Sequence, residues 1–106
     1  MDDEPRVLRF SGRIDATTAP EMEKTIFECL GEGSTKVIID LESVDYMSSA
    51  GLRVLLSALK KMKSVGGDLR LSSLQPHVRE VFEMTGFSRL FTIFPTVNEA
   101  KSGIKS

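Results

Sequence analysis

Ser48 and Ser49 are adjacent residues whose hydroxyl side chains could carry a phosphate or contribute to an anion-binding site. They follow an apolar segment and precede a periodic helical pattern, so we expect them at a strand-to-helix turn. Backbone N–H groups at the start of a helix lack intrahelical acceptors, and the helix dipole is positive there. Such a turn tolerates a phosphate on either serine and can hold a bound anion. Capping of the helix is the other role open to both serines, and it is the more frequent one.

The segments on either side of the serines must position them. Residues 37–39 are continuously apolar and Leu41 follows, which predicts a fully buried strand over 36–41 with parallel neighbours. After the serines, apolar residues recur at spacings of three and four, which predicts a helix with one stripe packed on the sheet. The stripe consists of Leu52, Leu55, Leu56, Leu59, Met62 and Val65.

The rest of the chain repeats this alternation of strand and helix. Strands are expected over 7–10, 36–41, 68–73 and 90–94, with Gly12 ending the first. Helices are expected from Thr18 to about Gly31, from the serines to Gly66, from Pro76 to Gly86, and from Thr96 onward. Thr18 with Glu21, and Thr96 with Glu99, fit capping boxes. The order βαβαβαβα predicts one α/β domain over 1–106, with a mostly parallel sheet of four to five strands and about four helices.

Sites in open parallel sheets lie beyond the carboxyl ends of the strands. Two loops, 12–18 and 42–51, follow the first two predicted strands. If those strands are neighbours, three carboxylates gather around one edge of the sheet together with the two serines. These carboxylates are Asp15, Asp40 and Asp45.

Composition excludes several functional classes. The formal charge of the 106 residues is -1 and no basic block occurs, which argues against a nucleic-acid or anionic membrane surface. No apolar run is long enough to cross a membrane, and the acidic start at Met1–Arg6 is unlike a signal peptide, so we expect a cytoplasmic protein. Cys29 reads as a small buried thiol, and His77 has no second ligand with which to share a metal. We therefore expect no metal and no cofactor.

Five segments in order carry a family resemblance. They are 11–15 (SGRID), 37–41 (VIIDL), 46–52 (YMSSAGL), 66–69 (GGDL) and 81–87 (VFEMTGF). At this spacing the chain resembles the STAS domain, and within that family the single-domain bacterial anti-sigma factor antagonists. The resemblance covers nearly the whole chain and implies a STAS-like α/β fold.

The resemblance implies a regulatory protein that is not an enzyme. Its partner would be an anti-sigma factor that is also a serine kinase of the histidine-kinase-like ATPase type. The unphosphorylated form would bind this kinase and release a sigma factor, phosphorylation of Ser49 would block binding, and a serine phosphatase would reset the switch. The partner-binding residues would be Asp15, Tyr46, Met47, Ser48, Ser49, Ala50, Gly51 and Arg53.

Two positions depart from the family pattern. Ser48 stands where the family usually has Asp, and Arg53 stands where it usually has Gly. The first departure leaves Ser48 as a second choice of phosphoacceptor. Arg53 adds a cation that either pairs with the phosphate or faces water. Met47 falls at an apolar position typical of the core, and the alternative is partial exposure beside the serines, where a flexible thioether suits a partner surface.

Two alternatives from other functional classes remain. A STAS-type regulatory subunit of a membrane transporter would share the fold without needing a phosphoacceptor. A small enzyme could be built on the acidic edge, including a receiver-like metal site at Asp40 and Asp45. The sequence argues against the enzyme, because it offers no nucleophile-and-base pair and no Gly-rich cofactor loop after a strand.

Overall fold

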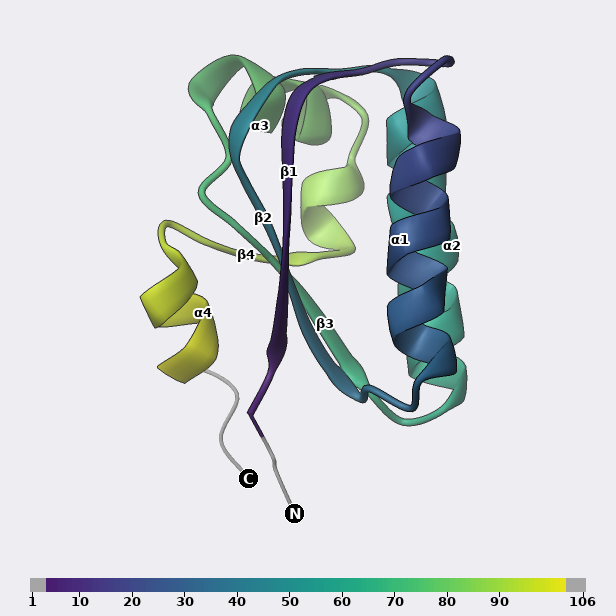
Figure 1. Cartoon of the computed structure of the whole chain (residues 1–106). Helices are drawn as coiled ribbons and strands as arrows, with labels where there is room; N and C mark the ends of the chain where they lie inside the picture. The colour runs from purple at the N-terminus through teal and green to yellow at the C-terminus, as the bar shows by residue number, and fades with distance from the viewer. Residues whose placement is uncertain (1–3, 103–106) are drawn as a thin grey trace.

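The computed structural model describes residues 4–102 and contains a sheet whose strands are all parallel, in the order β1-β2-β3-β4 (Figure 1). The predicted α/β fold with a parallel sheet is therefore confirmed. Neighbouring strands in the sheet are consecutive in sequence, which is the common arrangement for successive strand–helix–strand units. The strands are β1 (Arg6–Ile14), β2 (Lys36–Met47), β3 (Asp68–Ser72) and β4 (Thr92–Phe94).

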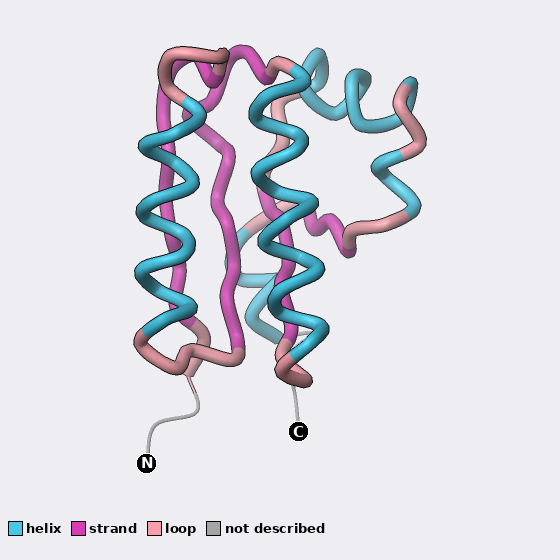
Figure 2. Tube along the Cα trace, turned by 90° about the vertical axis from the view of Figure 1, so that its right-hand side faces the viewer, coloured by secondary structure: helices cyan, strands magenta, loops and turns pink. Residues whose placement is uncertain are grey.

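Two long helices, α1 (Ala19–Gly31) and α2 (Ser49–Ser64), run side by side along one face of the sheet (Figures 1 and 2). The short helix α4 (Val97–Ser102) packs against β2, β3 and β4 on the other side of the sheet from α1 and α2. Helix α3 (Pro76–Met84) and the 3-10 helix η1 (Phe87–Arg89) contact each other, and α3 also contacts β2. The carboxyl ends of β1 and β2, where α1 and α2 begin, are at the top of Figure 1.

The hydrophobic core lies mainly between the sheet and the pair α1 and α2. Residues 37–41 of β2 are all buried, as the apolar run predicted. The stripe on α2 is largely confirmed, but Val65 is 54% exposed because α2 ends at Ser64 and Val65 lies beyond the last turn that faces the sheet. Val54 and Ala58 are buried as well, since α1 covers a second side of α2. Cys29 is buried, as predicted.

Strands β1 and β2 are longer than the sequence predicted. Gly12 does not end β1, because it pairs with Val44 of β2 and pairing continues at Arg13 after a register shift. The positive φ of Gly12, 79°, accommodates this irregularity. β2 likewise continues to Met47, with Val44 and Met47 buried between exposed polar residues. The expected loop 42–51 is therefore mostly strand, and only Ser48 separates β2 from α2.

The predicted turns and helix caps are confirmed only in part. The capping box at Thr18 is wrong, because the Thr18 hydroxyl donates to the Arg13 carbonyl at 2.7 Å and accepts from the Asp15 N–H at 2.8 Å. At the other predicted box, the Thr96 hydroxyl does accept from the Glu99 N–H at 3.1 Å. Gly66 and Gly86 have the predicted left-handed conformation. The last strand is shorter than 90–94, since Leu90 directly follows η1.

No helix within residues 4–102 combines the length and the apolar character that crossing a membrane requires.

Candidate functional site

The site is built on the first turn of α2, where Ser48 is the N-cap residue. Its backbone is extended, with φ -90° and ψ 175°, and its N–H donates to the Ile14 carbonyl at 2.8 Å. Its hydroxyl oxygen accepts from the Gly51 N–H at 3.4 Å, and its carbonyl accepts from the Leu52 N–H at 3.0 Å. Ser48 is half-buried. Its hydroxyl is thus engaged in capping α2 while its backbone attaches the helix to β1.

Ser49 has a different environment, although it is the next residue. It is the first residue of α2, its side chain is exposed, and its hydroxyl has no hydrogen-bond partner anywhere in 4–102. Nothing in the described part of the fold therefore has to be broken to modify this hydroxyl. The predicted presentation of a hydroxyl at a helix N-terminus is present at Ser49.

The residues beneath the serines are closely packed. Met47 is only 2% exposed, so its prediction as a core residue is confirmed and the alternative of a partly exposed thioether is wrong. It is buried because β2 continues to this residue and directs its side chain into the core with Ile14. Gly51 is buried too, and a Cβ placed on it would lie 2.7 Å from Cγ2 of Ile14. Met47 and Gly51 therefore support the serines from below rather than offering atoms to a partner.

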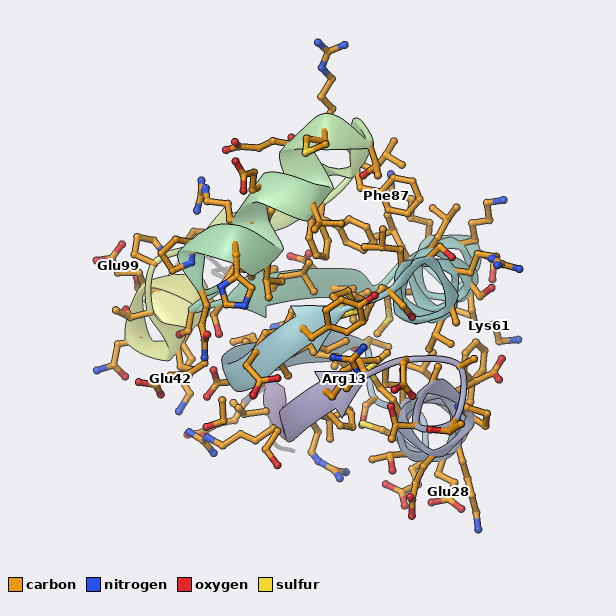
Figure 3. All side chains as sticks on the ribbon, turned by 90° about the horizontal axis from the view of Figure 1, so that it is seen from above. Arg13, Glu28, Glu42, Lys61, Phe87 and Glu99 are labelled. Atoms are coloured by element: carbon orange, nitrogen blue, oxygen red, sulfur yellow. The ribbon has the colours of Figure 1, made fainter. Side chains whose placement is uncertain are left out.

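Arg13 on β1 flanks the site and was not among the predicted site residues. It is paired in register with Tyr46 of β2, and its guanidinium lies 4.0 Å from the centroid of the Tyr46 ring. Its Nε also donates to Oδ2 of Asp15 at 3.1 Å. Figure 3, which views the molecule from above, shows Arg13 at the end of the strands. Only the strand register brings Arg13 to Tyr46, so no local sequence signal could have identified this contact.

Asp15 organises the turn between β1 and α1. Its Oδ1 accepts from the hydroxyl of Thr17 at 2.7 Å, from the Thr17 N–H at 3.0 Å and from the Thr18 N–H at 3.3 Å. These bonds, the Thr17 hydroxyl first among them, lower the pKa of the Asp15 carboxyl to about 2, with Arg13 adding to the effect. The carboxylate is therefore a turn residue beside the site, and it is charged at any physiological pH.

The prediction that Asp15, Asp40 and Asp45 lie together near the serines is wrong for Asp40. Asp40 is buried in β2, where its Oδ2 accepts from Nε of Arg9 at 3.1 Å and its Oδ1 accepts from the Glu42 N–H at 3.0 Å. Because β2 continues straight past it, Asp40 lies about 20 Å along the strand from Met47. The long β2 thus separates Asp40 from the serines.

Asp45 does lie near the end of β2, and a second segment reaches it there. Its carbonyl oxygen is contacted by Nε2 of His77, the second residue of α3. His77 is exposed, as expected, but it also ties the start of α3 to β2. In residues 4–102, no three His, Cys, Asp or Glu side chains come together as a metal would require.

Beyond Ser49, the exposed surface continues along α2. Arg53 is exposed four residues later, and a shallow groove between α1 and α2 begins beside it. We call this groove the α1–α2 groove. It is lined by Ala16, Ala19, Pro20, Glu23, Ala50, Arg53, Val54 and Ser57. Small side chains on both helices leave this surface open next to the serine.

Comparison with known proteins identifies related chains. The family model described as the STAS domain matches residues 2–100. BtrV of Bordetella bronchiseptica, named as an anti-sigma factor antagonist, is 41% identical over 91 residues, which cover 86% of this chain and 76% of that protein. The anti-sigma-F factor antagonist RsfB of Mycobacterium tuberculosis is 28% identical over 101 residues, covering 93% and 80%.

A solved structure agrees with these sequence relatives. The crystal structure of an anti-sigma factor antagonist from Mycobacterium paratuberculosis superimposes with a TM-score of 0.86 at 28% identity, covering 94% of this chain and 85% of that one. Sequence relatives and the solved structure thus point to the same family through nearly the whole chain. With the family model spanning almost all of its length, this chain belongs to the STAS domain family.

Proposed function

We propose that this protein is an anti-sigma factor antagonist whose binding is switched by phosphorylation of Ser49. The observation that carries the proposal is the exposed, unpartnered Ser49 hydroxyl at the N-terminus of α2, in the part of the chain that the structure describes. The names of the relatives support an anti-sigma factor as the partner. Regulation by binding, without chemistry of its own, is the function this site fits.

The binding surface we propose is formed by residues around the first turn of α2, all of them exposed except the half-buried Ala50. Tyr46 and Arg13 form one side, Ser49 and Ala50 the centre, and Arg53 the side toward the α1–α2 groove. Asp15 positions Arg13 through their ion pair. Met47, Ser48 and Gly51 contribute by fixing the turn from below and by capping it.

The switching step is a phosphoryl transfer carried out by the partner, a serine kinase of the histidine-kinase-like ATPase type. A bond forms between Oγ of Ser49 and the γ-phosphorus of ATP, the bond to ADP breaks, and the hydroxyl proton leaves to a base on the kinase. A serine phosphatase hydrolyses the ester and restores the hydroxyl. Ser48 is the poorer acceptor, because its oxygen is half-buried and already accepts a hydrogen bond from Gly51.

Electrostatics accounts for the loss of binding after phosphorylation. A phosphoserine adds about -1.5 to -2 charges, so a partner carboxylate ~5 Å away at an effective dielectric of ~20 is repelled by roughly 5 to 6 kcal/mol before screening. One third of that weakens affinity by more than about tenfold. Within the free protein the helix dipole favours the phosphate by only about 0.3 to 1 kcal/mol. Phosphorylation therefore changes the complex far more than the fold.

Phosphorylation itself is tested by incubating the protein with a serine-kinase anti-sigma factor from the same genome and ATP, followed by intact mass and peptide mapping. We expect a gain of one phosphate on Ser49 in the wild-type protein and in Ser48→Ala. Ser49→Ala should gain none. Loss of the phosphate from Ser48→Ala but not from Ser49→Ala would assign the acceptor to Ser48 and overturn the proposal.

Binding is tested by calorimetry with the same kinase. The Ser49→Ala protein should bind, whereas a phosphoserine at position 49 should weaken binding by about tenfold or more, and Ser49→Asp should weaken it in the same direction by less, since its charge is smaller. The matched control is Ser64→Asp, which adds the same charge at the exposed last residue of α2, at the opposite end of the helix from Ser49 and outside the α1–α2 groove. Equal affinity of Ser49→Asp and Ser49→Ala would contradict the switch.

A further inference from the structure

Arg53, four residues after the candidate phosphoacceptor, has no ion-pair partner among residues 4–102. Five other arginines, Arg6, Arg9, Arg13, Arg70 and Arg79, each form an ion pair with a carboxylate. Arg53 and Arg89 form none with any residue of the described range, and of these two only Arg53 is on α2. Arg53 is unpaired although Glu23 lines the same α1–α2 groove. An exposed guanidinium with all its N–H donors unused can bind an incoming anion without first losing another.

Helix geometry places this guanidinium over Ser49. Residues four apart share one face of a helix, with their Cβ atoms about 6 Å apart. Side chains on a helix lean toward its N-terminus, so the Arg53 side chain leans back over the turn that begins at Ser49. A phosphate on the Ser49 oxygen would extend toward the same space. The planar guanidinium fork matches two phosphate oxygens at once.

The backbone of the same turn offers two more donors. Of the first four N–H groups of α2, that of Gly51 is bonded to the Ser48 hydroxyl and that of Leu52 to the Ser48 carbonyl. The N–H groups of Ser49 and Ala50 have no acceptor within 4–102. Within the described residues, the start of α2 thus offers an anion two backbone N–H groups without an acceptor and one guanidinium without an ion pair.

We propose that Arg53 binds the phosphate of phosphorylated Ser49 and holds it against the first turn of α2. This inference rests on the proposed function, because it concerns the modified form of the same serine. Arg53 then acts as a positioning residue for the phosphate. It holds the phosphate next to the end of the α1–α2 groove that lies beside Ser49. Its positive charge also neutralises part of the negative charge of the phosphate.

The test measures the phosphate directly. The full chain is produced with phosphoserine incorporated at position 49 during translation, and the second ionisation of the phosphate is followed by phosphorus NMR. A nearby guanidinium favours the dianion, so the second pKa in the wild-type protein should be lower than in Arg53→Gln by about 0.2 to 0.4 pH units, the size expected of an exposed pair four residues apart. Arg53→Lys should show an intermediate value, since a lysine keeps the charge but loses the fork.

The matched control is Lys60→Gln, which removes one exposed positive charge from α2 at a distance from Ser49. Its phosphate should titrate as in the wild-type protein, and raising the salt concentration should bring the wild type toward Arg53→Gln. Circular dichroism of each variant checks that α2 is intact. The proposal is overturned if the wild type, Arg53→Gln and Lys60→Gln titrate alike, or if Lys60→Gln shifts as much as Arg53→Gln.

The two proposals fail separately. The phosphoserine is incorporated during synthesis, so this titration does not depend on any kinase. If a kinase and ATP leave Ser49 unmodified, the proposed function fails while the titration still reports on Arg53. If the three proteins titrate alike, the role of Arg53 fails while phosphorylation of Ser49 stands.

Discussion

Ser48 and Ser49 are adjacent at the start of α2, but they have different roles. The Ser48 oxygen caps the helix and its N–H attaches the helix to Ile14, whereas the Ser49 oxygen is exposed and unbonded within the described residues. The backbone causes this division, because the extended N-cap residue turns its side chain back toward the helix and the first helical residue turns its side chain outward. The residues alone predicted a strand-to-helix turn at the two serines and left capping and modification open for both, whereas the family resemblance favoured Ser49 as the phosphoacceptor.

A prediction at the residue scale concerns Asp15. Its pKa is lowered to about 2 by hydrogen bonds from Thr17 and Thr18, so the folded state favours the charged carboxylate. The stability that follows is fully present above the unfolded pKa of about 3.9 and is lost as the pH falls toward 2. We expect Asp15→Asn to be less stable than the wild type at pH 7, with the difference shrinking as the pH falls below about 4. Urea unfolding across this pH range measures it.

The control for the Asp15 experiment is Glu28→Gln, which removes one exposed carboxylate from α1. It corrects for the general effect of losing a negative charge. If the wild type and Asp15→Asn differ in free energy of unfolding by the same amount at pH 2.5 and pH 7, the lowered pKa of Asp15 is not the cause of the difference.

At the element scale, the junction of β1, β2 and α2 determines the position of the site. Parallel pairing of β1 with β2 continues past the irregularity at Gly12, and this places Ile14 beside Met47 at the end of both strands. Helix α2 then begins directly over these two side chains, with Gly51 as its point of closest approach. The first turn of α2 is held by packing on one side and is open to solvent at Ser49 on the other.

Gly51→Ala tests this junction. Alanine is favoured over glycine in a helix by about 1 kcal/mol, but the new Cβ would lie 2.7 Å from Cγ2 of Ile14, and such overpacking costs about 1 to 3 kcal/mol. We expect a net loss of about 1 kcal/mol in the free energy of unfolding, measured in urea. Gly31→Ala is the matched control at the last residue of α1, where a Cβ meets nothing within 4 Å and φ is not positive. Gly31→Ala should be neutral or stabilising, and equal behaviour of the two variants would argue against the close contact.

At the scale of the whole molecule, α3 in the second half of the chain packs into the same hydrophobic core that supports the site. Phe82 of α3 is fully buried and meets Phe91 edge-to-face, with ring centroids 5.9 Å apart. The same helix begins at the contact of His77 with Asp45. The packing of α3 therefore extends from the core to the end of β2 that precedes the serines.

We expect Phe82→Ala to lower the free energy of unfolding by about 3 to 5 kcal/mol, because it leaves a cavity in the core. A loss of this size is a large part of the roughly 5 to 15 kcal/mol that stabilises a typical domain. Met84→Ala, on the same helix but 80% exposed, should change stability by less than about 0.5 kcal/mol. Thermal and urea unfolding compare the two, and a small effect of Phe82→Ala would show that α3 contributes little to the core.

The sequence by itself determined the order of elements, the buried run 37–41, the amphipathic α2 and the turn that carries Ser48 and Ser49. These features depend on local spacing and local backbone preferences, which a single sequence displays directly. Some local signals gave wrong predictions. Gly12 was expected to end β1, but pairing with β2 continues past it. Thr18 was expected to cap α1, but its hydroxyl bonds to Arg13 and Asp15 in the preceding turn.

Only the tertiary structure decided which side chains share the site. The register of β1 on β2 brought Arg13 over Tyr46, buried Met47 and extended β2 until Asp40 was far from the serines. The docking of α3 brought His77 to Asp45. Each of these contacts joins residues about thirty positions apart, and a shift of one residue in strand register would reverse which side chains face the core. Such contacts depend on the packing of the whole sheet, so no local pattern in the sequence encodes them.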